Sequence, residues 1–333
     1  MIGYYAMPTS NSTDFSLNGL QLMESALRLS RQLGIGQSVD AEVYNIAKQN
    51  LNIMMRHWEN SGVRIWGIER GILFPSYGQA QFDIPVVTSG VPSAYCCLES
   101  DYRQNSLSVA AAAGASSVTL TDAVEYVAGD YIGIASQSNG LMWFKVNSVV
   151  GQVVNLYEVG TTTAASLPYA ASADAIVVGF TTLAWQPLRI IEARRKDLSD
   201  TTGGVEVPLK IVGKFDYERI PNKLLQSIPI QIYEQVMIDH TRLFVWPTTA
   251  YSNWAIGYSY ERRYQDIDSS INSLDFPPEA YEALRYGLAS RLGVEFAIDG
   301  NRQMYLDAKA EQYFQVMRNW SAGKSSVRFG VAR

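Results

Sequence analysis

Apolar residues recur at steps of three or four positions in four stretches of the chain, and this period is typical of helices with one buried face. Two stretches, residues 20–33 and 39–61, lie on either side of Gly34. The other two lie near the end of the sequence, at residues 277–298 and 302–320. The pattern therefore predicts a helical hairpin at the start of the chain and two long helices at its end.

Between these helices the period changes to the alternation and short apolar runs of β-strands. Residues 72–74 and 81–84 are predicted as two strands of a hairpin. From residue 95 to residue 180, short apolar runs recur and turn residues separate them, with Asn139-Gly140 as a strong hairpin signal. This segment predicts a small β-barrel or sandwich inserted into another domain.

We therefore expect an α+β fold, in which a helical hairpin and long C-terminal helices accompany a mixed β region and an inserted small all-β domain. The first part of the core is residues 1–94, with the helical hairpin and the β-hairpin. The insert is residues 95–180, and the second part of the core is residues 181–320. Residues 321–333 form a tail that contains basic residues and no acidic one.

Composition narrows the classes of function. Only 18% of the 333 residues are charged, below the roughly 25% of an average soluble protein, so partners are expected to cover part of the surface. The net charge of −5 argues against wrapping of nucleic acid, which needs a basic footprint. Residues 1–8 lack the features of a signal peptide, and no apolar run approaches the ~20 residues that span a bilayer. We expect synthesis in a host cytoplasm and no membrane partner.

The sequence offers little to support chemistry. The two histidines, His57 and His240, lie in no zinc or nucleophile motif, although Asp239 could orient the ring of His240. Cys96 and Cys97 are expected to be small buried apolar residues. We therefore expect no enzyme activity and no catalytic, metal or cofactor site. The 20 tyrosines and 7 tryptophans could stack on sugars, but their spread along the chain favours core and interface roles.

Several short stretches outside the insert are not distinctive one by one, but their order and spacing along the chain are. They are Glu24-Ser25-Ala26-Leu27-Arg28-Leu29 running to Gly34, Leu51-Asn52-Ile53-Met54-Met55 running to Trp58 and Gly62, the segment from Phe74 to Ile84, Gln186-Pro187-Leu188-Arg189-Ile190-Ile191-Glu192-Ala193, Leu243-Phe244-Val245-Trp246-Pro247, and Phe276-Pro277-Pro278-Glu279-Ala280-Tyr281 running through Tyr286 and Leu288 to Leu292. In this order the chain resembles the head-to-tail adaptor proteins of short-tailed bacteriophages, which complete the head and stabilise the packaged DNA.

The resemblance implies a non-enzymatic structural protein at the neck of the virion, where the head meets the tail. Twelve copies would form a ring below the portal protein, extend the DNA channel, retain the DNA and carry the tail. The implied partners are the portal, sister copies and tail hub, nozzle or fibre proteins. Double-stranded DNA would pass through without sequence-specific binding, which suits an acidic chain because phosphate binds tightly to a basic lining.

The same resemblance leads to two sets of candidate residues. The portal contact is expected in the tail and the end of the preceding helix, at Arg318, Lys324, Arg328, Phe329 and Arg333. Contacts between copies, or the core, are expected at Trp58, Pro187, Arg189, Trp246, Pro247 and Trp320. The alternatives are a tail-associated peptidoglycan hydrolase and a receptor- or sugar-binding tail component that uses the insert.

Overall fold

The computed structural model describes residues 15–61, 63, 67–136, 140–199, 205–250 and 253–321. Their contacts divide the chain into two compact units, a helical unit from residues 1–67 and 264–333 and a β unit from residues 68–263. Every described helix longer than ten residues belongs to the helical unit, and every described strand belongs to the β unit. The finer division of the chain at residues 94, 180 and 320 stays a prediction.

The expected fold class, an α+β fold led by a helical hairpin and long C-terminal helices, is wrong. The structure is 35% strand and 26% helix, with five sheets among the described residues, so strands dominate it. The β-hairpin expected at residues 72–84 does not form either. Its two strands, β1 (Ile68–Phe74) and β2 (Gln81–Ile84), pair with other strands in separate sheets. A long helical stripe is a strong sequence signal, whereas strands of a few residues are weak ones.

The first two helices start at well-formed caps. Helix α1 (Gly19–Leu29) begins with a capping box, in which the side chains of Asn18 and Gln21 each accept a hydrogen bond from the other residue's backbone N–H. Helix α2 (Ala41–Asn60) begins at Asp40, whose carboxylate accepts from the N–H of Glu42. These caps satisfy N–H groups that have no partner inside the helix.

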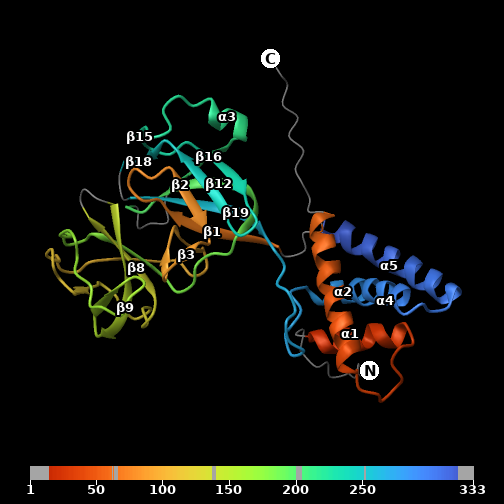
Figure 1. Cartoon of the computed structure of the whole chain (residues 1–333). Helices are drawn as coiled ribbons and strands as arrows, with labels where there is room; N and C mark the ends of the chain where they lie inside the picture. Colours follow the sequence, from red (N-terminus) through yellow and green to blue (C-terminus); the bar gives the residue numbers. More distant parts are fainter. Residues whose placement is uncertain are drawn as a thin grey trace, which may run out of the picture. The chain divides into compact units, whose positions relative to one another are not determined.

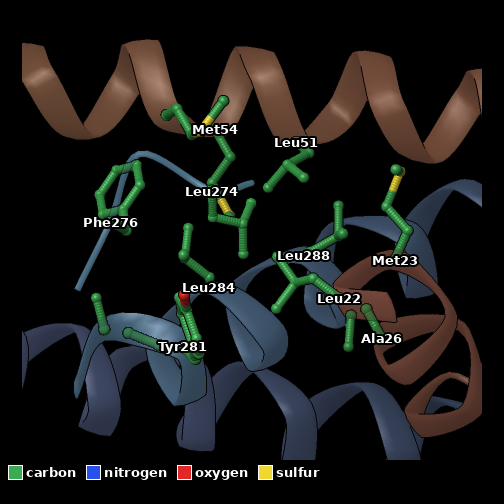
Figure 2. Packing of buried hydrophobic residues seen from close by; sticks show 14 of the residues in the cluster. Leu22, Met23, Ala26, Leu51, Met54, Leu274, Phe276, Tyr281, Leu284 and Leu288 are labelled. Carbon is green, nitrogen blue, oxygen red and sulfur yellow. The ribbon is translucent and has the colours of Figure 1, made fainter. Parts of the chain in front are cut away.

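Helix α4 (Tyr281–Glu295) is the centre of the helical unit. A short 3-10 turn, η1 (Pro278–Ala280), leads into it, and α5 (Gly300–Ser321) packs along it. Both α1 and α2 pack on α4 more than on each other, so the predicted hairpin needs a third helix to bury its apolar stripes. Figure 2 shows this core, with side chains from α1, α2, α4 and the segment that precedes η1 pointing inward: Leu22, Met23, Ala26, Leu51, Met54, Leu274, Phe276, Tyr281, Leu284 and Leu288.

The β unit contains two central sheets. The five-stranded sheet has the order β13-β12-β19-β1-β5, with bounds Glu206–Pro208, Pro187–Asp197, Trp254–Arg262, Ile68–Phe74 and Tyr95–Leu98. The four-stranded sheet has the order β14-β16-β17-β2, with bounds Lys210–Ile211, Gln231–Val236, Thr241–Trp246 and Gln81–Ile84. Two ribbons complete this part, β15 (Gln226–Ser227) with β18 (Thr248–Thr249) and β3 (Val87–Thr88) with β4 (Val91–Pro92).

Side chains alternate between the two faces of each central sheet, so each sheet contributes to two hydrophobic cores. On β1, Leu73 faces the core between the two central sheets, whereas Phe74 faces the opposite side. On β17, Val245 faces the same central core, whereas Phe244 packs on Tyr217 of helix α3 (Lys214–Glu218). The second core of the five-stranded sheet includes residues of the third large sheet, such as Phe180.

That third sheet is formed by residues 103–180 and is entirely antiparallel. Its order is β6-β11-β8-β9-β10-β7, with bounds Arg103–Ser106, Ile176–Phe180, Tyr131–Ser136, Gly140–Val150, Val153–Glu158 and Ser117–Thr119. A bridge between Leu107 and Leu120 joins the ends of its two edge strands, so the sheet curls around a core of its own. The hairpin predicted from Asn139-Gly140 is confirmed, because β8 pairs with β9, although Asn139 itself lies outside the described residues.

The β unit is therefore a stack of four layers that share three hydrophobic cores. In order, the layers are the curled sheet of residues 103–180, the five-stranded sheet, the four-stranded sheet and α3. Figure 1 shows β8 and β9 on one side of the central strands and α3 on the other. The curled sheet and α3 thus form the two ends of the stack.

We expect Leu51→Ala to destabilise the helical unit by about 2–5 kcal/mol, because Leu51 is completely buried and its truncation leaves a cavity between α2 and α4. Ile53→Ala is the matched control, since Ile53 lies on the same helix and is 51% exposed, and it should change stability by less than about 0.5 kcal/mol. Calorimetric unfolding of the full chain measures both effects. Equal losses in the two variants would contradict the assigned packing.

Candidate functional site

The structure divides the predicted contact residues between the two units. Trp58 is buried in the helical core, and Pro187 and Pro247 are buried in the β unit. Trp246 is half-buried, and its indole Nε1 donates to the carbonyl of Asn222 at 2.8 Å. These four side chains are therefore parts of the two folded units and not of one exposed site.

The remaining predicted residues are exposed or lie outside the described ranges. Arg189 is exposed on β12, and Arg318 and Trp320 are exposed on the last turn of α5. The four tail residues, Lys324, Arg328, Phe329 and Arg333, lie outside the described residues. Whether the tail contacts a portal protein therefore stays a prediction.

The histidine with an acidic neighbour belongs to a cluster of charges on β2 and β17. Arg242 lies directly opposite Asp83 and donates from Nε and Nη2 to its two carboxylate oxygens at 2.6 and 2.9 Å. The Nδ1 of His240 lies 2.7 Å from Asp239, and its Nε2 lies 3.8 Å from Asp83. The hydrogen bonds from Arg242 hold the pKa of Asp83 below its ordinary value. The cluster therefore fastens edge strand β2 to β17.

The other chemically reactive side chains are buried among apolar residues. Cys96 and Cys97 are free thiols on β5, and burial raises the pKa of Cys96 to about 12. Burial also raises the pKa of Cys97. Both thiols stay protonated at neutral pH, so they act as small packing residues. In the described ranges no group of three or more His, Cys, Asp or Glu side chains could hold a metal ion.

Exposed apolar side chains gather near α3, at one end of the β unit. Phe215 is 71% exposed and Leu224 is 68% exposed, and Leu225, Ile228 and Ile230 are also exposed. Basic residues accompany them, because Lys210, Lys214 and Arg219 are exposed in the same segment. We call these eight residues the basic surface. Exposed apolar groups of this kind are typical of sites that contact another macromolecule.

A second exposed apolar group lies on the curled sheet, in the loop of residues 122–127. Val124 is 88% exposed and Val127 is also exposed. The loop carries two exposed carboxylates, Asp122 and Glu125. We call this segment the acidic loop. A third group of exposed apolar residues lies on α5, at Met304, Tyr305, Val316 and Trp320.

These surfaces were not predicted from the sequence. The adjacent leucines at 224 and 225 and the valines at 124 and 127 have the composition of ordinary strand or core residues. Their exposure is decided by which neighbours the fold brings over them, and a single sequence does not contain that information. The presence of two prolines, Pro221 and Pro229, around Leu224 and Leu225 is the one local sign that this segment is irregular.

Comparisons with known proteins give weak likenesses. No family model and no curated protein matches the chain. Among solved structures it is similar to the gp54 tailspike of Acinetobacter baumannii bacteriophage AP22, solved in complex with A. baumannii capsular saccharide, at 12% identity and a TM-score of 0.21. It is also similar to the tailspike gp61 of Pseudomonas phage phi297, at 17% identity and a TM-score of 0.22. Each match covers 26% of this chain and only 15% of the tailspike chain.

None of the helices in the described ranges is long and apolar enough to cross a membrane.

We expect Asp83→Asn to lower the stability of the β unit by about 1–3 kcal/mol at pH 7, because it removes a charge-assisted pair between β2 and β17. The pKa of Asp83 is lower in the folded state than its ordinary value of 3.8. The stability that the carboxylate adds is therefore fully present at a pH above 3.8, and it is lost as the pH falls through the folded-state pKa. Thermal unfolding of both chains between pH 7 and pH 2.5 measures the difference. Glu158→Gln, an exposed neutralisation in the same unit, is the control. A difference that persists unchanged at pH 2.5 would contradict the role of the carboxylate.

Proposed function

We propose that this chain is a non-enzymatic structural protein of a bacteriophage virion, and that it forms the connector ring between head and tail. In this role, copies of the chain assemble below the portal protein, extend the DNA channel, retain the packaged DNA and provide the attachment platform for tail proteins.

The observation that carries the proposal is the presence of separate exposed apolar surfaces on one chain. The basic surface, the acidic loop and the exposed side chains of α5 lie on different elements. A subunit of an assembly needs more than one contact surface, because it touches sister copies on two sides and other proteins above and below. Surfaces of this kind would be unfavourable on a protein that works alone in water.

The order of segments that resembles the adaptor proteins also supports the proposal. Those segments supply α1, α2 and α4 of the helical unit and β2, β12 and β17 of the β unit. The resemblance therefore involves both units and is not confined to one amphipathic helix. The curled sheet of residues 103–180 is the part that these segments do not include.

The charge of the chain suits a channel that DNA crosses without being held. The net charge is −5, so a ring of these chains would not bind the phosphate backbone tightly. The tail of residues 321–333 carries three basic residues and no acidic one, and we assign it to the contact with the portal, together with Arg318. A local cluster of positive charge is suited to an acidic protein surface.

The proposal is tested first by the location of the protein. Electron microscopy of virions carrying a labelled copy of the chain should place the label at the neck. Label on tail fibres, or clearing of peptidoglycan by the purified protein that a single Asp or Glu substitution abolishes, would contradict the connector role.

We expect a chain that ends at Ser321 to give particles that package DNA and then lose it, because the tail that fastens the ring to the portal is missing. The DNA content of purified particles, measured over time after packaging, records this loss. Ser325→Ala with Ser326→Ala in the full-length tail is the matched control, since it keeps Lys324, Arg328 and Arg333. Full retention of DNA with normal tail attachment in the truncated chain would contradict the role of the tail.

A further inference from the structure

We propose that the acidic loop of one copy binds the basic surface of the next copy, in a head-to-tail contact between identical chains. This inference rests on the proposed function only in that both require several copies to assemble. It names the two surfaces that meet, which neither the resemblance nor the comparisons supply.

The acidic loop is held rigidly by a buried ion pair beneath it. The Nη1 of Arg103 lies 2.9 Å from Asp130, whose side chain is completely buried, and Arg103 also donates to the carbonyl of Glu125. The same oxygen of Asp130, Oδ2, also accepts a hydrogen bond from the backbone N–H of Val127 at 2.9 Å. Both contacts fix the backbone of the loop itself.

The acidic loop has a buried side and an exposed side. Ala123 and Tyr126 are buried, and the ring of Tyr126 packs so closely on Gly179 that a side chain at Gly179 would overlap it. Val124 and Val127 point outward, on either side of the exposed carboxylate of Glu125. An apolar pair that is fixed before binding loses little conformational entropy when it is covered.

Part of the basic surface is built on regular elements, since Lys210 lies on β14 and Lys214 and Phe215 lie on α3. The N–H of Lys210 donates to the carbonyl of Ile230 at 3.0 Å, which places a basic residue beside an exposed apolar one. The guanidinium of Arg219 lies 4.7 Å from the ring centre of Phe215. Among the described residues, neither Lys210 nor Lys214 makes an ion pair. Their charges are therefore available to an acidic partner.

Charge complementarity selects a second copy as that partner. Residues 210–230 contain four basic and two acidic residues in a chain whose net charge is −5, so the rest of each copy is acidic. Residues 103–180 contain two basic and five acidic residues. Asp216 and Glu218 are also exposed in the segment of the basic surface, so that its charge is a net excess of positive charge. Because each surface combines exposed apolar side chains with an excess of charge of one sign, the acidic loop and the basic surface complement each other in both respects.

The layer order of the β unit allows this contact to repeat. The acidic loop belongs to the curled sheet and the basic surface to the α3 end, and two central sheets separate them. Figure 1 shows α3 and the strands β8 and β9 of the curled sheet on different sides of those central strands. A contact between two different surfaces of identical chains propagates from copy to copy, and it closes into a ring when the rotation per copy allows.

The first test is a disulfide between two chains. Chains with Val124→Cys and chains with Leu224→Cys are mixed and oxidised, both as concentrated purified protein and in particles assembled from both variants. We expect a covalent dimer on a denaturing gel without reductant. The native thiols of Cys96 and Cys97 are buried, so they should not form disulfides between chains. Val150→Cys replaces Val124→Cys in the control, since Val150 is also exposed on the curled sheet. It should give much less dimer, because a disulfide forms only where the two Cα atoms approach within about 7 Å.

The second test exchanges the charges. Glu125→Lys in the first chain should lower the yield of dimer about fivefold, and Lys214→Glu in its partner should restore it. Both positions are exposed, and an acidic residue at the start of α3 is compatible with the helix dipole. Rescue in the doubly exchanged pair distinguishes a direct contact from a general loss of folding.

The outcomes separate this inference from the proposed function. The inference is overturned if Val124→Cys gives no more dimer than the Val150→Cys control, both in purified protein and in particles. This holds even if the protein lies at the neck. If the purified protein forms the specific dimer but the virus particles contain no copy of the chain, the contact is supported and the connector role is overturned. Binding to vesicles of anionic phosphatidylglycerol that Lys214→Glu abolishes, without any specific dimer, would assign the basic surface to a membrane and would also overturn the inference.

Discussion

The architecture of the β unit depends on one constraint, which is that both central sheets are buried on both faces. Successive residues of β1, such as Leu73 and Phe74, enter different hydrophobic cores. The same is true of Phe244 and Val245 on β17. A slip of one residue in the register of either strand would exchange its two sets of side chains and disturb two cores at once. Fixed register in the central sheets therefore keeps the curled sheet and α3 at constant positions within the stack.

Polar contacts at the edges of the stack fix the orientation of strands and loops, which hydrophobic burial alone does not do. Hydrophobic contact is non-directional, so it does not by itself orient an edge strand or a loop. The pair of Asp83 and Arg242 aligns β2 with β17, and the pair of Arg103 and Asp130 fixes the loop above the curled sheet. A buried ion pair adds little net stability because both charges lose their hydration. Its contribution here is to fix the orientation of β2 and of the acidic loop.

The sequence predicts the helices far better than the sheets. The stripes that contain Leu51 and Leu288 mark α2 and α4, and Asn139-Gly140 marks the hairpin of β8 and β9. The partners of β1 and β2 could not be predicted, because strand pairing joins residues as distant as Asp83 and Arg242 and leaves no local pattern. The expected fold class is wrong for this reason, because short strands whose partners are unknown give a weaker signal than long helical stripes. The exposed surfaces escaped prediction because Val124 and Leu224 differ from core residues only in what covers them.

The helical unit is assembled from both ends of the described chain, and this has a consequence for its biosynthesis. More than 200 residues separate α2 from α4, the helix on which it packs. At roughly 5–20 residues per second, a ribosome needs about 10–45 s to deliver α4 after α2 has emerged. During that interval the apolar stripes of α1 and α2 have no native partner, while the whole β unit is available to fold between them. The apolar stripes of α1 and α2 are therefore open to binding by chaperones until α4 has emerged.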